Sequence, residues 1–125
     1  MNVQERENAI CFMNEKKSKY LNKRKLINGI VFASQKEANR YLQLKDWQDE
    51  GIISNLRTQV KYELQPKYRI GIKPIRSITY IADFVYNDRN GNEIVEDVKG
   101  FKTEIYKLKK KMFEYKYQKE IKEVY

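Results

Sequence analysis

Residues 78–100, "ITYIADFVYNDRNGNEIVEDVKG", predict a β-hairpin at the centre of the fold. The first part, 78–86, is rich in β-branched and aromatic side chains, which favour strands. The dipeptide Asn90–Gly91 is typical of a tight hairpin turn, so residues 93–99 are expected to form the return strand. Acidic residues are unusual inside so apolar a hairpin, so the faces on which they lie indicate whether they form a site.

Two carboxylates of this hairpin are expected to lie side by side. Side chains alternate across a strand, so Asp97 and Lys99 should share one face of the return strand and Glu96 the other. The same alternation predicts one shared face for Ile81, Asp83 and Val85. A buried carboxylate such as Asp83 is costly unless it is paired or bound to a cation. Because the turn brings Asp83 beside Asp97, a divalent cation would remove their repulsion, and oxygen ligands suit Mg²⁺ or Mn²⁺.

A helix is predicted upstream of the hairpin. Ser34 and Glu37 form a capping box, and Gly51 is a natural C-terminal stop. An apolar stripe follows at helical spacing: Ala38, Tyr41, Leu44 and Trp47. Glu37 borders this stripe and is therefore a candidate fourth member of the acidic site, although helix capping alone would also explain it.

The remaining elements complete a mixed architecture. Residues 52–70 contain one or two extended pieces interrupted at Pro66, and 71–77 are expected to form a loop. Thr103 caps a second helix, whose predicted apolar side is Ile105, Leu108, Met112 and Tyr115. Residues 120–125 alternate like a last strand. The resulting order, helix, three strands, helix, strand, predicts a fold that contains both helices and strands, of the α/β (α+β) class.

Composition narrows the function classes. Lys and Arg number 26 against 17 Asp and Glu, a net charge of +9, which favours polyanionic partners such as nucleic acid. The sequence has no histidine, which excludes imidazole-based hydrolysis, and the single Cys11 excludes an internal disulfide or a zinc knuckle. No apolar run is long enough for a membrane span, and the N-terminus lacks a signal-peptide pattern, so a cytoplasmic protein is expected.

Three blocks carry a resemblance to a known family. "NGIVFASQKEANRY", "ITYIADFVY" and "EDVKGFKTEIYKLKKKMFEYKY" resemble small phage and prophage proteins, long described as a domain of unknown function and grouped with the PD-(D/E)XK nuclease superfamily. The resemblance covers residues 19–125, so 1–18 are expected to be a helical or mobile extension. The superfamily pattern is a helix Glu, a strand Asp and (Asp/Glu)-x-Lys, which here correspond to Glu37, Asp83 and Asp97-Val98-Lys99.

The resemblance implies a restriction-endonuclease-like core, which is a mixed central sheet flanked by helices, and a metal-dependent endodeoxyribonuclease. Asp83, Asp97 and the backbone carbonyl of Val98 would hold Mg²⁺ or Mn²⁺, and Glu37 would complete the shell directly or through water. Lys99 would position or deprotonate the attacking water. The expected DNA contacts are Arg40, Lys102, Lys107, Lys109, Lys110 and Lys111. The family match also places Gln59 at a recurrent position, with no role that the sequence assigns.

The resemblance leaves the substrate and two alternative functions to be considered. No base-reading module is visible, so branched DNA such as a Holliday junction is the expected substrate, and resolving it would require a homodimer. Two alternatives stay open: a non-catalytic DNA-binding protein with a nuclease fold, or a phage protein that acts on a host protein. Simpler roles also exist for single residues, since Asp-x-Lys can be a surface ion pair and a lysine run is often a solvated helix face.

Overall fold

The computed structural model describes residues 24–125 of the 125-residue chain. The extension predicted for residues 1–18 lies outside the described part, as does the expected domain start at residue 19. Contacts divide the chain into one unit that ends at Asp46 and a second unit from Trp47 to Tyr125. Within residues 24–125, no helix is long and apolar enough to cross a membrane.

The first unit contains a small hairpin followed by a helix. Strands β1 (Lys25–Ile27) and β2 (Ile30–Phe32) pair antiparallel. Their turn residues Asn28 and Gly29 both have positive φ, the conformation that a two-residue hairpin turn requires. Helix α2 (Gln35–Asp49) begins where sequence analysis expected it.

Both ends of α2 follow local sequence signals. The Oγ atom of Ser34 accepts the backbone N–H of Glu37 at 3.2 Å, which satisfies one unpaired amide of the first turn. Gly51 has a φ of +79° just after the helix and ends it. Of the predicted stripe, Ala38, Tyr41 and Leu44 are buried.

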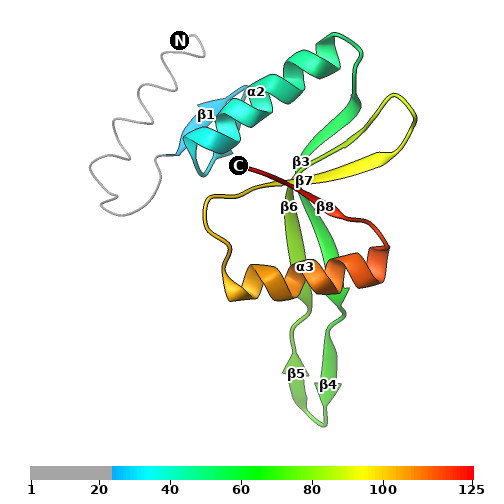
Figure 1. The fold of residues 1–125 in the computed structure, drawn as a ribbon. Helices are drawn as coiled ribbons and strands as arrows, with labels where there is room; N and C mark the ends of the chain where they lie inside the picture. Colours follow the sequence, from blue (N-terminus) through cyan, green and yellow to red (C-terminus); the bar gives the residue numbers. More distant parts are fainter. Residues whose placement is uncertain (1–23) are drawn as a thin grey trace. The chain divides into compact units, whose positions relative to one another are not determined.

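The second unit is built on a four-stranded mixed sheet (Figure 1). The sheet order is β3-β6-β7-β8, formed by β3 (Ser54–Gln65), β6 (Ile78–Asn87), β7 (Glu93–Val98) and β8 (Ile121–Val124). The first three strands are antiparallel neighbours, whereas β7 and β8 run parallel. Helix α3 (Glu104–Tyr117) is the crossover between those two parallel strands. The predicted mixed α+β class and the main element order are confirmed.

Residues 71–77 are not the loop that we predicted. Lys73–Ile75 form strand β5, which pairs antiparallel with β4 (Tyr68–Ile70) in a separate two-stranded sheet. We refer to residues 66–77 as the arm. The prediction was wrong because Pro74 suggests a loop, but its partner Arg69 lies across a ribbon with two open edges, where a residue without an N–H is tolerated.

The buried side of α3 also differs from the prediction. Tyr106 and Phe113 are buried, whereas Ile105, Leu108 and Tyr115 are 68%, 59% and 83% exposed. Of the predicted apolar side, only Met112 packs against the core. The Phe113 ring lies 4.9 Å from Tyr62 and 5.4 Å from Tyr80, centroid to centroid. Large aromatic side chains bury more apolar area than Ile or Leu. The aromatic side of the helix therefore packs on the sheet.

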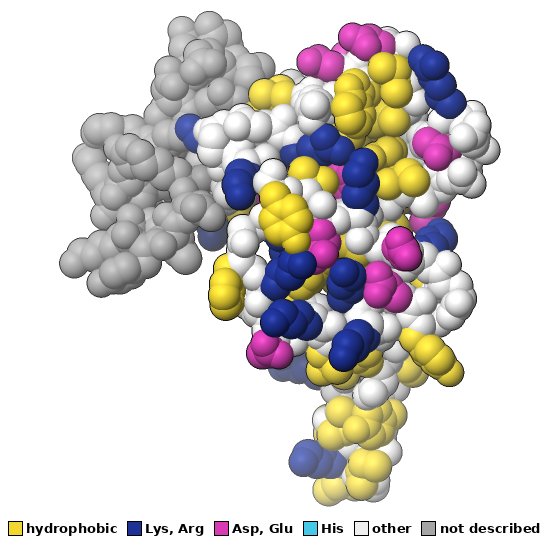
Figure 2. All heavy atoms as spheres, in the orientation of Figure 1, with side chains coloured by type: hydrophobic (Ala, Val, Ile, Leu, Met, Phe, Trp, Pro, Cys, Tyr) yellow, Lys and Arg dark blue, Asp and Glu magenta, His cyan; other side chains and the backbone are white. Residues whose placement is uncertain are grey.

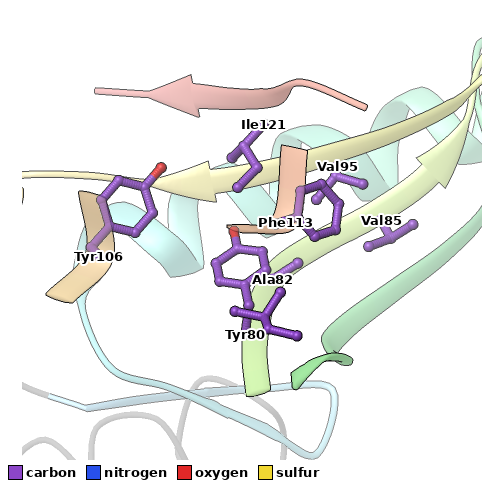
Figure 3. Close-up of a cluster of buried hydrophobic side chains, with 8 residues drawn as sticks. Tyr80, Ala82, Val85, Val95, Tyr106, Phe113 and Ile121 are labelled. Atoms are coloured by element: carbon purple, nitrogen blue, oxygen red, sulfur yellow. The ribbon is translucent and has the colours of Figure 1, made fainter. Parts of the chain in front are cut away.

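Figure 3 shows the resulting core between α3 and one face of the sheet. The buried members are Leu64, Tyr80, Ala82, Val85, Val95, Tyr106, Phe113 and Ile121. We call this face of the sheet, the one covered by α3, the helix face. It contains Tyr80 and Ala82 together with Val85, although regular alternation would place Val85 opposite them.

Side-chain alternation in β6 is therefore broken between Ala82 and Val85. The register with β3 passes from Thr58–Phe84 to Val60–Ala82. Gln59 lies between, opposite Asp83, and has a φ of +53°. A left-handed residue reverses the local course of a strand, so the prediction that Ile81, Asp83 and Val85 share one face was wrong.

Candidate functional site

Asp83 sits at the break in β6, directly across from the end of β7. The paired residues Phe84–Glu96 and Val85–Val95 fix the register, which leads next to Asp83 and Asp97. The Oδ2 atom of Asp83 accepts the backbone N–H of Val98 at 2.9 Å. In a regular ladder, a main-chain carbonyl of β6 would accept this N–H, and here the side-chain carboxylate accepts it instead. This contact positions Asp83 against the segment that carries Asp97 and Lys99.

Asp97 is held by two donors on the helix face. It is 3% exposed. Its Oδ1 lies 3.0 Å from Nζ of Lys99, and its Oδ2 accepts the hydroxyl of Tyr80 at 2.6 Å. Burial and the charge of Asp97 raise the pKa of Tyr80, so this hydroxyl stays protonated and donates. Asp97 and Lys99 lie on one face, as alternation predicts.

Lys99 links Asp97 to a third carboxylate. Its Nζ lies 3.8 Å from the centre of the Tyr106 ring, a cation–π contact. The Tyr106 hydroxyl in turn donates to Oε2 of Glu123 at 3.0 Å. Glu123 is the register partner of Asp97 on β8. Asp83, Asp97 and Glu123 therefore follow one another across three neighbouring strands.

Sequence analysis missed Tyr80, Tyr106 and Glu123. The alternation of residues 120–125 placed Glu123 on a strand, and a parallel register with β7 would have placed it beside Asp97. No local signal identifies Tyr80, because its contact with Asp97 depends on the break in β6. We call the set Asp83, Asp97, Lys99, Tyr80 and Val98 the acidic site.

Glu96 lies on the opposite face of β7. It has no exposed surface, and its Oε2 accepts the hydroxyl of Tyr86 and lies 3.8 Å from Nζ of Lys122. Tyr80 and Tyr86 would share a face in a regular strand, yet they bind carboxylates on opposite faces. The two contacts independently locate the break in alternation between residues 80 and 86.

Two predicted residues belong to the other unit. Glu37 lies in the first turn of α2, where its backbone N–H donates to Ser34. Arg40 follows one turn later on the same helix. The capping role of the Ser34–Glu37 pair is supported by this bond. The contact of Glu37 with Asp83 and Asp97 stays a prediction.

Four of the five predicted DNA-binding lysines line a hollow with mixed charge, and Lys109 is not among its lining residues. Its lining includes Lys102, Lys107, Lys110, Lys111, Glu104, Glu114 and Glu123. Lys102 and Lys110 both contact Oε1 of Glu123, at 3.1 and 3.2 Å, and Lys107 contacts Glu104. Figure 2 shows basic and acidic side chains interleaved over α3. Several of the expected phosphate contacts are therefore already paired within the protein.

The charge pairing also affects Glu123 itself. Burial acts to raise its pKa, but hydrogen bonds from Lys102, Lys110 and Tyr106 outweigh burial and hold the pKa below its ordinary value. Glu123 is thus a stable anion beside the acidic site, and it keeps two lysines on this side of α3.

The donor set of the acidic site fits a hard divalent cation bound in part by its substrate. In residues 24–125, no three Asp, Glu, His or Cys side chains group closely enough to hold a metal ion by themselves. Mg²⁺ is usually held by one or two carboxylates, with waters and substrate phosphates completing the shell. Two neighbouring carboxylates, Asp83 and Asp97, meet that requirement.

Comparison with known proteins gives one match. Residues 17–125 match the model of a family described as "Protein of unknown function (DUF1064)". No curated protein and no solved structure matches the chain.

Proposed function

This chain belongs to the DUF1064 family, and we propose that it is a metal-dependent endodeoxyribonuclease that acts on branched DNA. One observation carries the proposal. Asp83 bonds to the amide of Val98, while Asp97 and Lys99 on either side of Val98 form an ion pair. Two carboxylates and an ammonium thus converge where the middle of β6 faces the end of β7, and these are the groups that phosphodiester hydrolysis needs.

Asp83, Asp97 and the carbonyl of Val98 would hold Mg²⁺ or Mn²⁺, with Glu37 adding a direct or water-mediated contact. When bound, the cation supplies charge stabilisation and lowers the pKa of a coordinated water. Tyr80 donates to one oxygen of Asp97 and so fixes the orientation of the carboxylate. The bond from Val98 does the same for Asp83.

Lys99 is the residue that we assign to the attacking water. Its ammonium lies between the carboxylate of Asp97 and the ring of Tyr106. Contact with a scissile phosphate would attract the ammonium away from Asp97, because the phosphate brings new negative charge. As an ammonium, Lys99 would hold the water and offset negative charge in the transition state. To act as the base instead, Lys99 would first have to lose its own proton to solvent, and the neutral amine would then take the proton of the water.

Branched DNA is the proposed substrate because the protein is strongly basic, with a net charge of +9, and sequence analysis finds no base-reading module. We further propose a phage or prophage origin, action in the bacterial cytoplasm, and a homodimer. A junction is resolved by two cuts, and two copies related by a two-fold axis would supply them.

The test is cleavage of a four-way junction, a flap and a linear duplex with Mg²⁺ or Mn²⁺. We expect the wild type to cut branched DNA better than linear duplex. Asp83→Asn and Lys99→Ala should each lose at least about 100-fold in rate, the size of a lost electrostatic contact to a transition state. Lys122→Ala is the matched control, because Lys122 contacts Glu96 on the other face.

Three outcomes contradict the proposal. Variants that cut as fast as the wild type would remove Asp83 and Lys99 from the site. A wild type that binds DNA but cuts none of the substrates would favour the non-catalytic alternative. A wild type that does not bind DNA even at low salt would favour a protein partner, because phosphate contacts strengthen as salt falls.

A further inference from the structure

The arm is the most exposed paired element of the described chain. Strands β4 and β5 pair only with each other, with Tyr68 opposite Ile75 and Ile70 opposite Lys73. Figure 1 shows the ribbon extending beyond the ends of β3 and β6, away from α3. An isolated two-stranded ribbon is marginally stable in water, so its exposure needs an explanation.

The arm carries only positive charge. Residues 66–77 contain Lys67, Arg69, Lys73 and Arg76, all exposed, and no acidic residue. The hollow beside α3 differs, because three glutamates share its lining with four lysines. The arm thus carries exposed cations with no acidic residue in its own sequence, which suits an external polyanion.

The arm also exposes apolar side chains. Tyr68 is 45% exposed, Ile70 65% and Ile72, at the tip, 94%. Alternation and register put Tyr68, Ile70 and Ile75 on one face of the ribbon, and Arg69 and Pro74 on the other. Figure 2 shows hydrophobic side chains exposed along the projecting arm. Exposed apolar side chains at a projecting tip indicate a contact surface.

We propose that the arm binds the substrate DNA at its branch point, an inference that rests on the proposed function and specifies how the substrate is selected. A two-stranded ribbon fits the major groove of a duplex, and the four cations would contact its phosphates. The apolar tip would contact bases beside the branch. Apolar wedges commonly insert between base steps at the cost of unstacking them, and that cost is lower where a branch has already interrupted stacking.

Binding without divalent metal separates this inference from catalysis. Fluorescence anisotropy in EDTA would compare a four-way junction with a linear duplex of the same sequence. Arg69→Gln/Lys73→Gln removes two arm charges, and Ile70→Ser/Ile72→Ser removes the apolar tip. Lys36→Gln/Lys61→Gln is the charge-matched control, since both lysines are exposed and lie outside the arm and the acidic site. Circular dichroism checks that each variant is folded.

The two arm variants should behave differently. The charge variant should bind both DNAs about tenfold more weakly, with a salt slope reduced by roughly two, one per lost phosphate contact. The tip variant should keep its duplex affinity and lose about tenfold in affinity for the junction, the size of one lost base contact. The control double variant should keep the wild-type preference for the junction.

Arm variants that bind both DNAs as tightly as the wild type would overturn the inference. If cleavage were still lost in Asp83→Asn, the proposed function would stand without it. Arm variants that lose DNA binding while the wild type cuts nothing would instead keep the arm and refute the nuclease. A tip variant that still prefers the junction but no longer self-associates in sedimentation would assign the tip to a second copy of the chain, which also overturns the inference.

Discussion

Asp97 and Glu96 are neighbours on β7, and their carboxylates serve different faces of one sheet. Asp97 accepts a hydrogen bond from the hydroxyl of Tyr80 and forms an ion pair with Lys99. The strand register places it next to Asp83 on the neighbouring strand β6. Glu96 accepts the hydroxyl of Tyr86 and has no exposed surface. Each acid has one tyrosine and one lysine partner. The difference lies in the second acid, because only Asp97 has another carboxylate positioned beside it.

Glu96 and Asp97 show that burial of a carboxylate is not by itself a sign of a chemical role. A buried carboxylate with a tyrosine partner stabilises a core and needs nothing further. A buried carboxylate beside a second carboxylate has repulsion that a cation relieves. Alternation in the sequence places the two acids on opposite faces and selects Asp97 as the site residue. A ranking by burial alone would have selected Glu96 instead.

Replacing each acid by its amide should give the largest contrast. Asp97→Asn weakens the bonds to Tyr80 and Lys99 but also removes the repulsion from Asp83, so we expect a nearly unchanged melting temperature. It removes a metal-binding charge, so cleavage should fall by at least about 100-fold. Glu96→Gln should leave cleavage within about threefold and lower the free energy of unfolding by about 1–2 kcal/mol, because a bond to a charged acceptor is weakened. Junction cleavage and denaturant unfolding measure the two effects. Equal loss of activity in two equally stable variants would remove the distinction.

Local signals account for the parts of the fold that the sequence predicted. The caps Ser34 and Thr103 and the stop at Gly51 depend only on near neighbours, and the structure contains all of them. The hairpin predicted around Asn90–Gly91 also forms, but through a loop over residues 88–92 and not a tight two-residue turn. The order of the main strands and helices follows from these signals. The faces of Asp97 and Glu96 follow from alternation within one regular strand.

Non-local packing decided the features that the sequence did not predict. Both sides of α3 carry apolar residues, and the contact of Phe113 with Tyr62 and Tyr80 selects one of them. Strand β5 is visible only through its pairing with β4. Opposite the break in β6, Gln59 of β3 has a positive φ, and glutamine is a residue type with no turn signature. Tyr80 and Glu123 were missed because their roles require these long-range contacts.

The break itself can be tested at Gln59, which resembled a recurrent family position without a role. Gln59→Val places a β-branched residue at positive φ and should lower the free energy of unfolding by about 1–2 kcal/mol. Gln59→Gly adopts this φ without a side-chain clash and should be neutral or slightly stabilising. Chemical denaturation of the two variants provides the measurement. If valine were tolerated as well as glycine, β3 would not be held at positive φ at this position.

The smallest expected effect concerns acid stability on the Asp97 face. Hydrogen bonds from Lys102, Lys110 and Tyr106 outweigh burial and hold the pKa of Glu123 below its ordinary value of 4.5. A lowered folded-state pKa means that the unfolded chain binds more protons, so the contribution of Glu123 is fully present above about pH 4.5 and is lost as pH falls through the folded pKa. Thermal unfolding of the wild type and Glu123→Gln from pH 6 to about pH 3 should therefore show a stability difference that shrinks with acidification. A difference that stays constant over this range would mean that Glu123 acts through packing, and Asp97 would then be the only acid of its face whose charge matters.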